Sequence, residues 1–152
     1  MRLRFFALVF LLLQIILAGC STVQEAGDSA LRDTAVKTYR YQELRDELIV
    51  EPLKLSPGVV SPGDMMSVEL KFAVLSPQKE KRFKVLEILT LSAADVRIQI
   101  LRQELERQQG LHVSMHRILV PKDIPPGDYT LVATVSAEDQ QVTKRAGFLV
   151  KK

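Results

Sequence analysis

Alternation of apolar and polar side chains is the dominant pattern of this chain from residue 47 onward. It is clearest within residues 67–75, where alternate positions separate into two sets: Val68, Leu70, Phe72 and Val74 against Ser67, Glu69 and Lys71. A period of two is that of a strand with one buried face. Turn residues flank the segment, in Ser61-Pro62-Gly63-Asp64 and in Ser76-Pro77. We therefore predict a strand here.

Similar patterns predict further strands. One face collects Tyr129, Leu131, Ala133 and Val135 within residues 129–135, and the last strand does so with Val142, Ala146, Phe148 and Val150, with Lys144 as an exception. Three more strands are expected at 49–55, 83–91 and 111–120. About seven short strands at this spacing predict a mainly β fold, an antiparallel sandwich of two sheets.

Residues 92–110, SAADVRIQILRQELERQQG, fit two interpretations. Ser92 and Gly110 are placed to cap the two ends of a helix. Val96, Ile98 and Ile100 instead alternate as in a strand, which a polar turn would follow. We favour the strand and keep the helix as the alternative. Both are compatible with a sandwich.

Residues 21–46 are polar and mixed in charge, and their apolar side chains are too scattered for a firm amphipathic stripe. They predict a tether, which would span roughly 30 Å if it were flexible. A helix that packs on the domain through Leu31, Val36 and Leu44 is the alternative.

The first 19 residues have the order of a secretory signal peptide. Arg2 and Arg4 precede an apolar run over residues 5–19, which ends in small residues. The run has no polar face for a surface helix, and it is shorter than the roughly 20 residues that cross hydrocarbon. We expect export of the chain and removal of this segment.

The run ends in Leu17-Ala18-Gly19-Cys20, which resembles the lipobox of bacterial lipoproteins. The resemblance implies cleavage before Cys20, a diacylglyceryl group on its sulfur and acylation of its new amino group. Several acyl chains anchor a protein durably, since each buried methylene contributes about 0.8 kcal/mol. In that family an Asp after the cysteine commonly retains the protein at the inner membrane. Because Ser21 follows here, the outer membrane is the expected location, on its periplasmic face or at the cell surface.

Composition narrows the classes of protein further. Cys20 is the only cysteine, so a single chain has neither an internal disulfide nor a multi-cysteine metal site. The formal charge of +3 includes Arg2 and Arg4, which leave with the signal, so the mature chain is nearly neutral. Such a chain with dispersed basic residues lacks the cationic face that nucleic acid requires. The absence of Trp disfavours a sugar-stacking platform.

A second resemblance lies near the carboxyl end. Pro126-Gly127-Asp128-Tyr129, followed by TLVATVS, resembles the penultimate strand of bacterial immunoglobulin-like and fibronectin type III-like domains. It implies an immunoglobulin-like sandwich over about residues 48–151. In that fold the tyrosine, here Tyr129 after Gly127, makes a corner contact from its hydroxyl to upstream backbone while its ring fills the core. The cysteine pair and central Trp of antibody domains are absent here.

His112 and His116 are the only histidines. On a strand, four residues cover about 13 Å, which is too far for both side chains to hold one zinc ion. We therefore expect exposed histidines on a strand face and no metal site.

The sequence shows few residues placed for nucleophilic or acid–base catalysis. Cys20 is committed to lipid, and no serine lies in a G-x-S-x-G motif. Two carboxylate pairs, Glu104 with Glu106 and Glu138 with Asp139, lie in polar runs where nothing is expected to shift a pKa. We expect no catalytic residues.

A basic cluster, Lys79, Lys81, Arg82 and Lys84, has the charge to contact anionic lipid head groups or an acidic surface. Glu80 interrupts it, and a solvated loop is the favoured interpretation.

The sequence thus predicts three segments: a signal peptide over 1–19, a lipidated N-terminus and tether over 20–46, and a sandwich domain over 47–152. The lipid on Cys20 is the only expected non-protein group.

The expected function is a non-catalytic protein-interaction or scaffold module, held at a membrane of the cell envelope by its lipid. The expected partner is an envelope protein, bound by a sheet edge or by loops at 56–64, 76–82 and 121–128. A small-ligand or carbohydrate-binding lipoprotein is the alternative.

Overall fold

The computed structural model describes residues 30–93 and 96–151. The predicted signal peptide, the lipobox residues Leu17, Ala18 and Gly19, the lipid attachment residue Cys20 and tether residues 20–29 lie outside the described residues.

A helix over residues 30–39 precedes the strands. The strands are β1 (Glu47–Val50), β2 (Lys54–Ser56), β3 (Val59–Val60), β4 (Met65–Leu75), β5 (Arg82–Ala93), β6 (Val96–Gln108), β7 (Gly110–Leu119), β8 (Gly127–Ala137) and β9 (Gln140–Val150).

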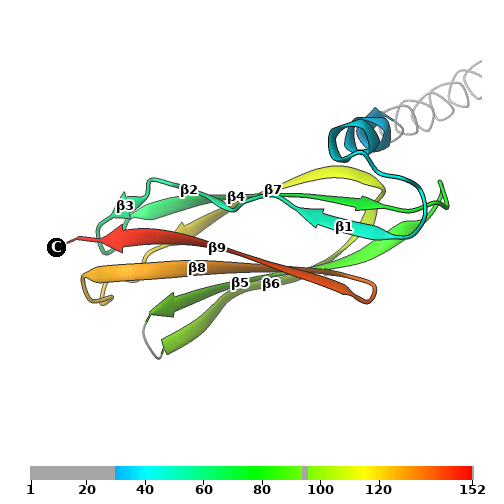
Figure 1. The fold of residues 1–152 in the computed structure, drawn as a ribbon. Helices are drawn as coiled ribbons and strands as arrows, with labels where there is room; N and C mark the ends of the chain where they lie inside the picture. Colours follow the sequence, from blue (N-terminus) through cyan, green and yellow to red (C-terminus); the bar gives the residue numbers. More distant parts are fainter. Residues whose placement is uncertain (1–29, 94–95, 152) are drawn as a thin grey trace, which may run out of the picture.

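These strands form two layers (Figure 1). In one, called sheet A here, β4 lies between β7 and the successive short strands β1 and β2. The other, sheet B, has the order β3-β9-β8-β5-β6. The chain crosses from sheet B to sheet A at Gln109, between β6 and β7. The predicted immunoglobulin-like sandwich is confirmed, with one difference: β3 pairs with β9 in parallel.

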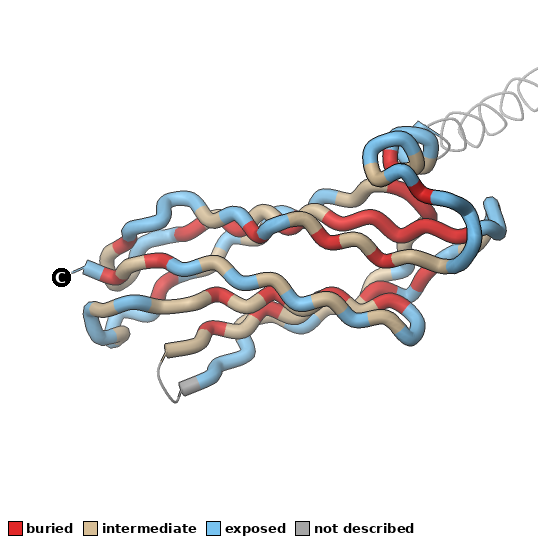
Figure 2. Tube along the Cα trace, in the orientation of Figure 1, coloured by how far each residue is buried: buried red, intermediate tan, exposed pale blue. Residues whose placement is uncertain are grey.

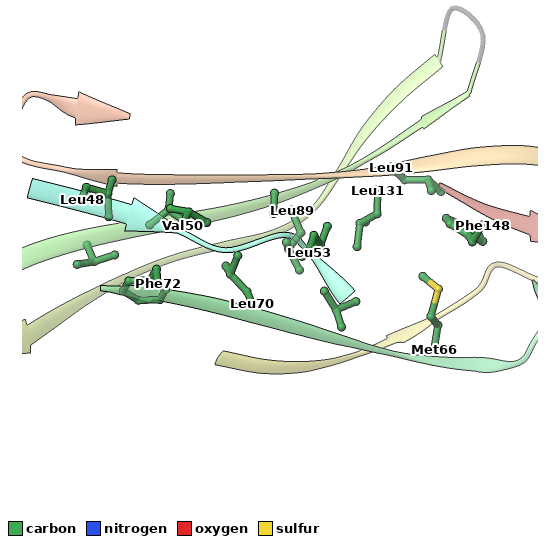
Figure 3. Close-up of a cluster of buried hydrophobic side chains, with 14 of the residues drawn as sticks. Leu48, Val50, Leu53, Met66, Leu70, Phe72, Leu89, Leu91, Leu131 and Phe148 are labelled. Atoms are coloured by element: carbon green, nitrogen blue, oxygen red, sulfur yellow. The ribbon is translucent and has the colours of Figure 1, made fainter. Parts of the chain in front are cut away.

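The core lies between the two sheets and follows from the alternation in the sequence (Figures 2 and 3). The four alternating apolar residues of the predicted strand 67–75, Val68, Leu70, Phe72 and Val74, point inward and are fully buried. Leu89 and Leu131 face them from sheet B. Full burial of a leucine or phenylalanine side chain contributes about 1.5–3 kcal/mol, so this double layer is the main source of stability.

One predicted strand is divided in the structure, and one short strand is additional. The single strand expected at 49–55 is split into β1 and β2, with Pro52 between them. A proline has no backbone N–H to donate to the sheet, which favours such an interruption. β3 was not predicted, because two residues are too short to show a period.

Within residues 92–110, the described residues other than Gln109 lie in strands, so the helix alternative is wrong, and so is the polar turn that was expected to follow the strand. β5 continues to Ala93, and β6 pairs with it along its whole length. The register places Leu101 and Leu105 opposite the buried Leu89 and Val85. The alternation therefore continues through the charged run, beyond a register shift at Leu89/Thr90.

The tether prediction is wrong from residue 30 onward, because the helix packs on the outer face of sheet A. Ala35 and Tyr41 are buried there against Ala73 and Leu75. The alternative of a packed helix is correct in kind, although Leu44, which was expected in its contact, is 80% exposed.

Polar contacts hold the helix to three other segments. The Arg32 guanidinium donates to Glu43 Oε1 at 2.7 Å and to Gln109 Oε1 at 3.2 Å. Gln109 Oε1 also accepts from the backbone N–H of Ser76 at 2.9 Å. At the other end of the helix, the Tyr39 hydroxyl donates to Glu51 at 2.6 Å. Burial, together with this carboxylate, raises the pKa of Tyr39 to about 12.

An ion pair between Lys81 and Asp46 joins the start of β1 to the β4–β5 loop. The Lys81 ammonium lowers the pKa of Asp46 below its usual 3.8. A lowered pKa in the folded state adds stability above the unfolded pKa, and this stability is lost as the pH falls through the folded value.

Asp46→Asn is therefore expected to lower the free energy of unfolding by roughly 1 kcal/mol at neutral pH, a size typical of partly exposed pairs. The deficit should shrink as the pH falls below 3.8 and through the lowered pKa of folded Asp46, where the wild-type carboxylate becomes protonated as well. Urea unfolding at the two pH values measures this, with exposed Asp123→Asn as the control. A deficit that is the same at both pH values would contradict the assignment.

Candidate functional site

The tyrosine corner lies at one end of the sandwich. The Tyr129 hydroxyl donates to the carbonyl oxygen of Pro125 at 2.8 Å, and the Tyr129 ring stacks on Phe148 with centroids 5.7 Å apart. Gly127, two residues earlier, has φ +154°, which a side chain rarely adopts. These contacts fix how the chain enters β8 and are structural.

The basic cluster does not form a single cationic surface. Lys81 lies between the carboxylates of Asp46 and Glu138, and Arg82 lies 3.8 Å from Glu106. The two carboxylate pairs noted in the sequence, Glu104 with Glu106 and Glu138 with Asp139, thus lie on the surface or beside cations.

The three loops expected to bind a partner do not gather at one end. Loops 56–64 and 121–128 adjoin each other, because Gly63 donates to the carbonyl oxygen of Val120. Loop 76–82 lies at the opposite end, where the backbone carbonyl of Ser76 contacts Arg32 of the helix. The candidate loops therefore lie at both ends of the sandwich.

The histidines occupy the inner face of β7, which corrects the expectation that they are exposed. Register pairs His112 with Phe72 and His116 with Val68, and both of these β4 residues are fully buried. The His112 ring lies 5.3 Å from the Phe72 ring. His116 keeps only 14% of its side-chain surface exposed.

β7 is thus inverted relative to the other long strands. Its polar residues His112, Ser114 and His116 point into the sandwich, and its apolar residues Val113, Met115 and Leu119 point outward. A polar inner face requires a polar partner across the core.

That partner is Glu87 of β5, which is 0% exposed. Ser114 Oγ donates to Glu87 Oε1 at 2.9 Å, and Gln103 Nε2 donates to Oε2 at 2.9 Å. His116 Nε2 lies 3.3 Å from Oε2, and Arg107 Nη2 lies 3.7 Å from Oε1. One buried carboxylate therefore joins three strands, β5, β6 and β7.

Sequence reasoning missed this cluster, although a signal for it exists. Glu87 occupies an inward position of the predicted strand 83–91, between Val85 and Leu89. A single carboxylate among inward apolar positions indicates either that the strand assignment is wrong or that the carboxylate is buried and has its own hydrogen-bond donors.

The cluster contains serine, histidine and carboxylate, but its geometry does not suit nucleophilic catalysis. An activated serine donates to the histidine, which the carboxylate orients. Here Ser114 donates to Glu87 itself, and Ser114 is only 6% exposed. The arrangement can neutralise and position a buried charge.

Next to the cluster, a groove of about 450 Å³ opens between β6 and β7. Its walls come from Leu89, Ile100, Leu101, Met115, His116, Arg117, Ile118 and Leu119. We call the region of this groove and the two strand edges beside it the open side. Within the described residues, β6 pairs only with β5, and β7 pairs only with β4.

The two free edges differ in their protection against pairing. β6 carries a register shift and outward charges that include Arg102 and Glu104, which are features that discourage an added strand. On β7, Val113 and Met115 are at least half exposed and Arg117 is the only outward charge. β7 is therefore the edge that is open to pairing.

Two further properties concern metals and membranes. The described residues contain no group of three or more His, Cys, Asp or Glu side chains placed to hold a metal ion. Within the same ranges, no helix has the length and apolar character needed to cross a membrane.

Comparison with known proteins gives a fold and no family. No family model matches this chain, and no curated protein matches it. Among solved structures, the CARDB domain of a Pyrococcus furiosus protein, in complex with di-metal ions, is 16% identical with a TM-score of 0.52. The match covers 73% of this chain and 93% of that one.

Two larger proteins contain a similar sandwich. A β-glucosidase from Erythrobacter marinus is 11% identical, with a TM-score of 0.52 over 70% of this chain. The alkylpurine DNA glycosylase AlkC of Pseudomonas fluorescens, bound to DNA with an abasic site analogue, is 12% identical, with a TM-score of 0.51 over 70%. This chain spans 16% and 31% of those proteins, so these likenesses show the fold alone.

Proposed function

We propose that this chain is a lipid-anchored protein of the bacterial cell envelope, attached through Cys20, and that its sandwich is a non-catalytic protein-interaction module. The lipobox Leu17-Ala18-Gly19-Cys20 supports the anchor. Both carboxylate oxygens of Glu87 already accept hydrogen bonds and the hydroxyl of Ser114 is buried, which supports a non-catalytic role. In this proposal the outer membrane is the location.

The open side is the observation that carries the binding proposal. An extended segment of a partner can pair its backbone with β7, because Arg117 is the only outward charge on that edge and its pairing with β4 has no register shift. Alternate side chains of an added strand point to the same face. Every second side chain would therefore enter the groove beside Leu101 and Ile118.

The test is crosslinking in intact cells, followed by recovery of the tagged full-length protein and identification of the captured envelope proteins. Ile98 of β6 is 50% exposed and lies two residues before Ile100 of the groove. Ile98→Lys should therefore reduce recovery of the partner at least several-fold, because a charge would meet the incoming apolar segment.

A matched control is Val59→Lys in β3, at the other edge of sheet B, where the side chain is 46% exposed. This variant should recover the partner as the wild type does. Cys20→Ala should lose the partner together with membrane attachment. Equal recovery with Ile98→Lys and with wild type would contradict binding at the open side. Recovery of nothing from a folded, membrane-bound protein would favour a small ligand in the groove instead.

A further inference from the structure

The outer face of sheet A carries exposed apolar side chains along β4 and β7, outside the area that the helix covers. Met65 is 51% exposed, Val113 50%, Met115 61% and Leu119 58%; we call these four the sheet A patch. Met65 and Leu119 are register partners on β4 and β7, and all four point away from the core. Single exposed apolar residues are ordinary, but a group on one face marks an interaction site.

The opposite outer face, on sheet B, is different in character. Its outward positions on β8 and β9 are mostly polar: Thr130, Thr134, Ser136, Gln141, Thr143 and Arg145. Leu86 and Ile88 of β5 and Val132 of β8 are apolar there, but they are partly buried, so the apolar side chains that are at least half exposed on these outer faces are those of sheet A.

Cations accompany the sheet A patch. The outward positions of β2, β4 and β7 include Lys54, Lys71 and Arg117, with Glu69 as their carboxylate. Lys54 and Lys71 lie 3.3 and 3.4 Å from Glu69 Oε1, and they lower the pKa of that carboxyl group. Glu47 of β1 and Glu51, which follows it, add two carboxylates to this face, so its cations and carboxylates nearly balance. Arg117 is the cation that lies between Met115 and Leu119 on β7, and its charge complements anionic lipid head groups.

The position of the anchor brings this face close to lipid. The helix, which begins ten residues after Cys20, packs on the same face of sheet A. Ten residues reach at most about 36 Å even when fully extended. A tether this short gives a high effective concentration of the domain at the membrane, so a weak surface contact becomes populated. This step rests on the lipid anchor of the proposed function.

We propose that the sheet A patch lies against the bilayer that holds the anchor. Met115 and Leu119 enter the interfacial region, and Lys71 and Arg117 contact anionic head groups. In this orientation sheet B faces away from the lipid. Met115, Arg117 and Leu119 belong both to the lipid contact and to the groove, so the walls that β6 contributes, Ile100 and Leu101, are the part of the open side that is accessible to a neighbouring envelope protein.

The test uses the full-length lipidated protein in vesicles of phosphatidylcholine with a minority of phosphatidylglycerol. Because Cys20 is the only cysteine and its sulfur carries lipid in this proposal, Met115→Cys introduces the only free thiol. A fluorophore on that thiol should be quenched several-fold more strongly by nitroxide-labelled lipid than a fluorophore on Thr143→Cys, which reports from sheet B. Adding Arg117→Glu should weaken the quenching at residue 115, and only in vesicles that contain phosphatidylglycerol.

The outcomes separate this inference from the function it rests on. A protein that fails to float with the vesicles refutes the anchor, and with it the proposed function. A protein that floats but shows equal quenching at residues 115 and 143 refutes the orientation alone. Shielding of residue 115 from both nitroxide lipid and an aqueous quencher would also overturn it, in favour of a second copy or another protein on the patch.

Discussion

Glu87→Ala is expected to lower the free energy of unfolding by about 3–5 kcal/mol, the cost of breaking a buried charge network by removing one partner. The carboxylate accepts from Ser114 and Gln103, and it lies close to two cationic or potentially cationic groups. Without Glu87, these donors keep their buried positions and lose their acceptor. Urea unfolding followed by circular dichroism measures the loss.

Two controls identify its cause. Glu106→Ala removes a carboxylate from the outer face of β6, where the side chain is 61% exposed, and should change stability by no more than about 0.5 kcal/mol. Glu87→Gln keeps the shape and one acceptor oxygen, so its loss should fall between the other two. A Glu87→Ala protein as stable as the Glu106→Ala protein would show that the cluster contributes little.

Gly110→Ala is expected to cost about 2–4 kcal/mol, from backbone strain together with overpacking. Gly110 has φ +132°, and a Cβ built there would lie 2.9 Å from the backbone carbon of Leu31 and 3.0 Å from the nitrogen of Arg32. Both contacts are with backbone, so relief requires the helix to move. The substitution should both destabilise the fold and loosen the helix on sheet A.

Urea unfolding measures the first effect, and limited proteolysis within residues 30–39 measures the second. Gly58→Ala is the matched control, because nothing lies within 4 Å of a Cβ there. If Gly110→Ala were cleaved no faster than Gly58→Ala within the helix, the close packing of β7 against the helix would be refuted.

The sequence predicted elements best where burial alone determines the residue type. Val68, Leu70 and Phe72 alternate without exception because nothing but core packing acts on the inner face of β4. The helix was harder to predict, because its buried contact uses little more than Ala35, Val36 and Tyr39. So short an apolar face does not distinguish a packed helix from a polar tether.

The candidate site was harder still, because its polar residues occupy inward positions. Gln103 and Arg107 interrupt the alternation of β6, and they do so because Glu87 across the strand pair provides their acceptor. In β7 the spacing of His112 and His116 correctly places both on one face. Which face of β7 points inward depends on its pairing with β4 and on the position of Glu87. Both lie elsewhere in the sequence.

The crossing at Gln109 also affects which partner segment the groove between β6 and β7 can bind. β6 and β7 meet at that corner. Along both strands the Glu87 cluster, with Gln103 and Ser114, lies nearer to the corner than the apolar groove walls Leu101 and Ile118. A partner strand that extends from the groove towards this corner therefore reaches the polar Glu87 cluster first. This order limits the length of the segment that the groove can accept, and it favours apolar side chains only at the end of the groove away from Gln109.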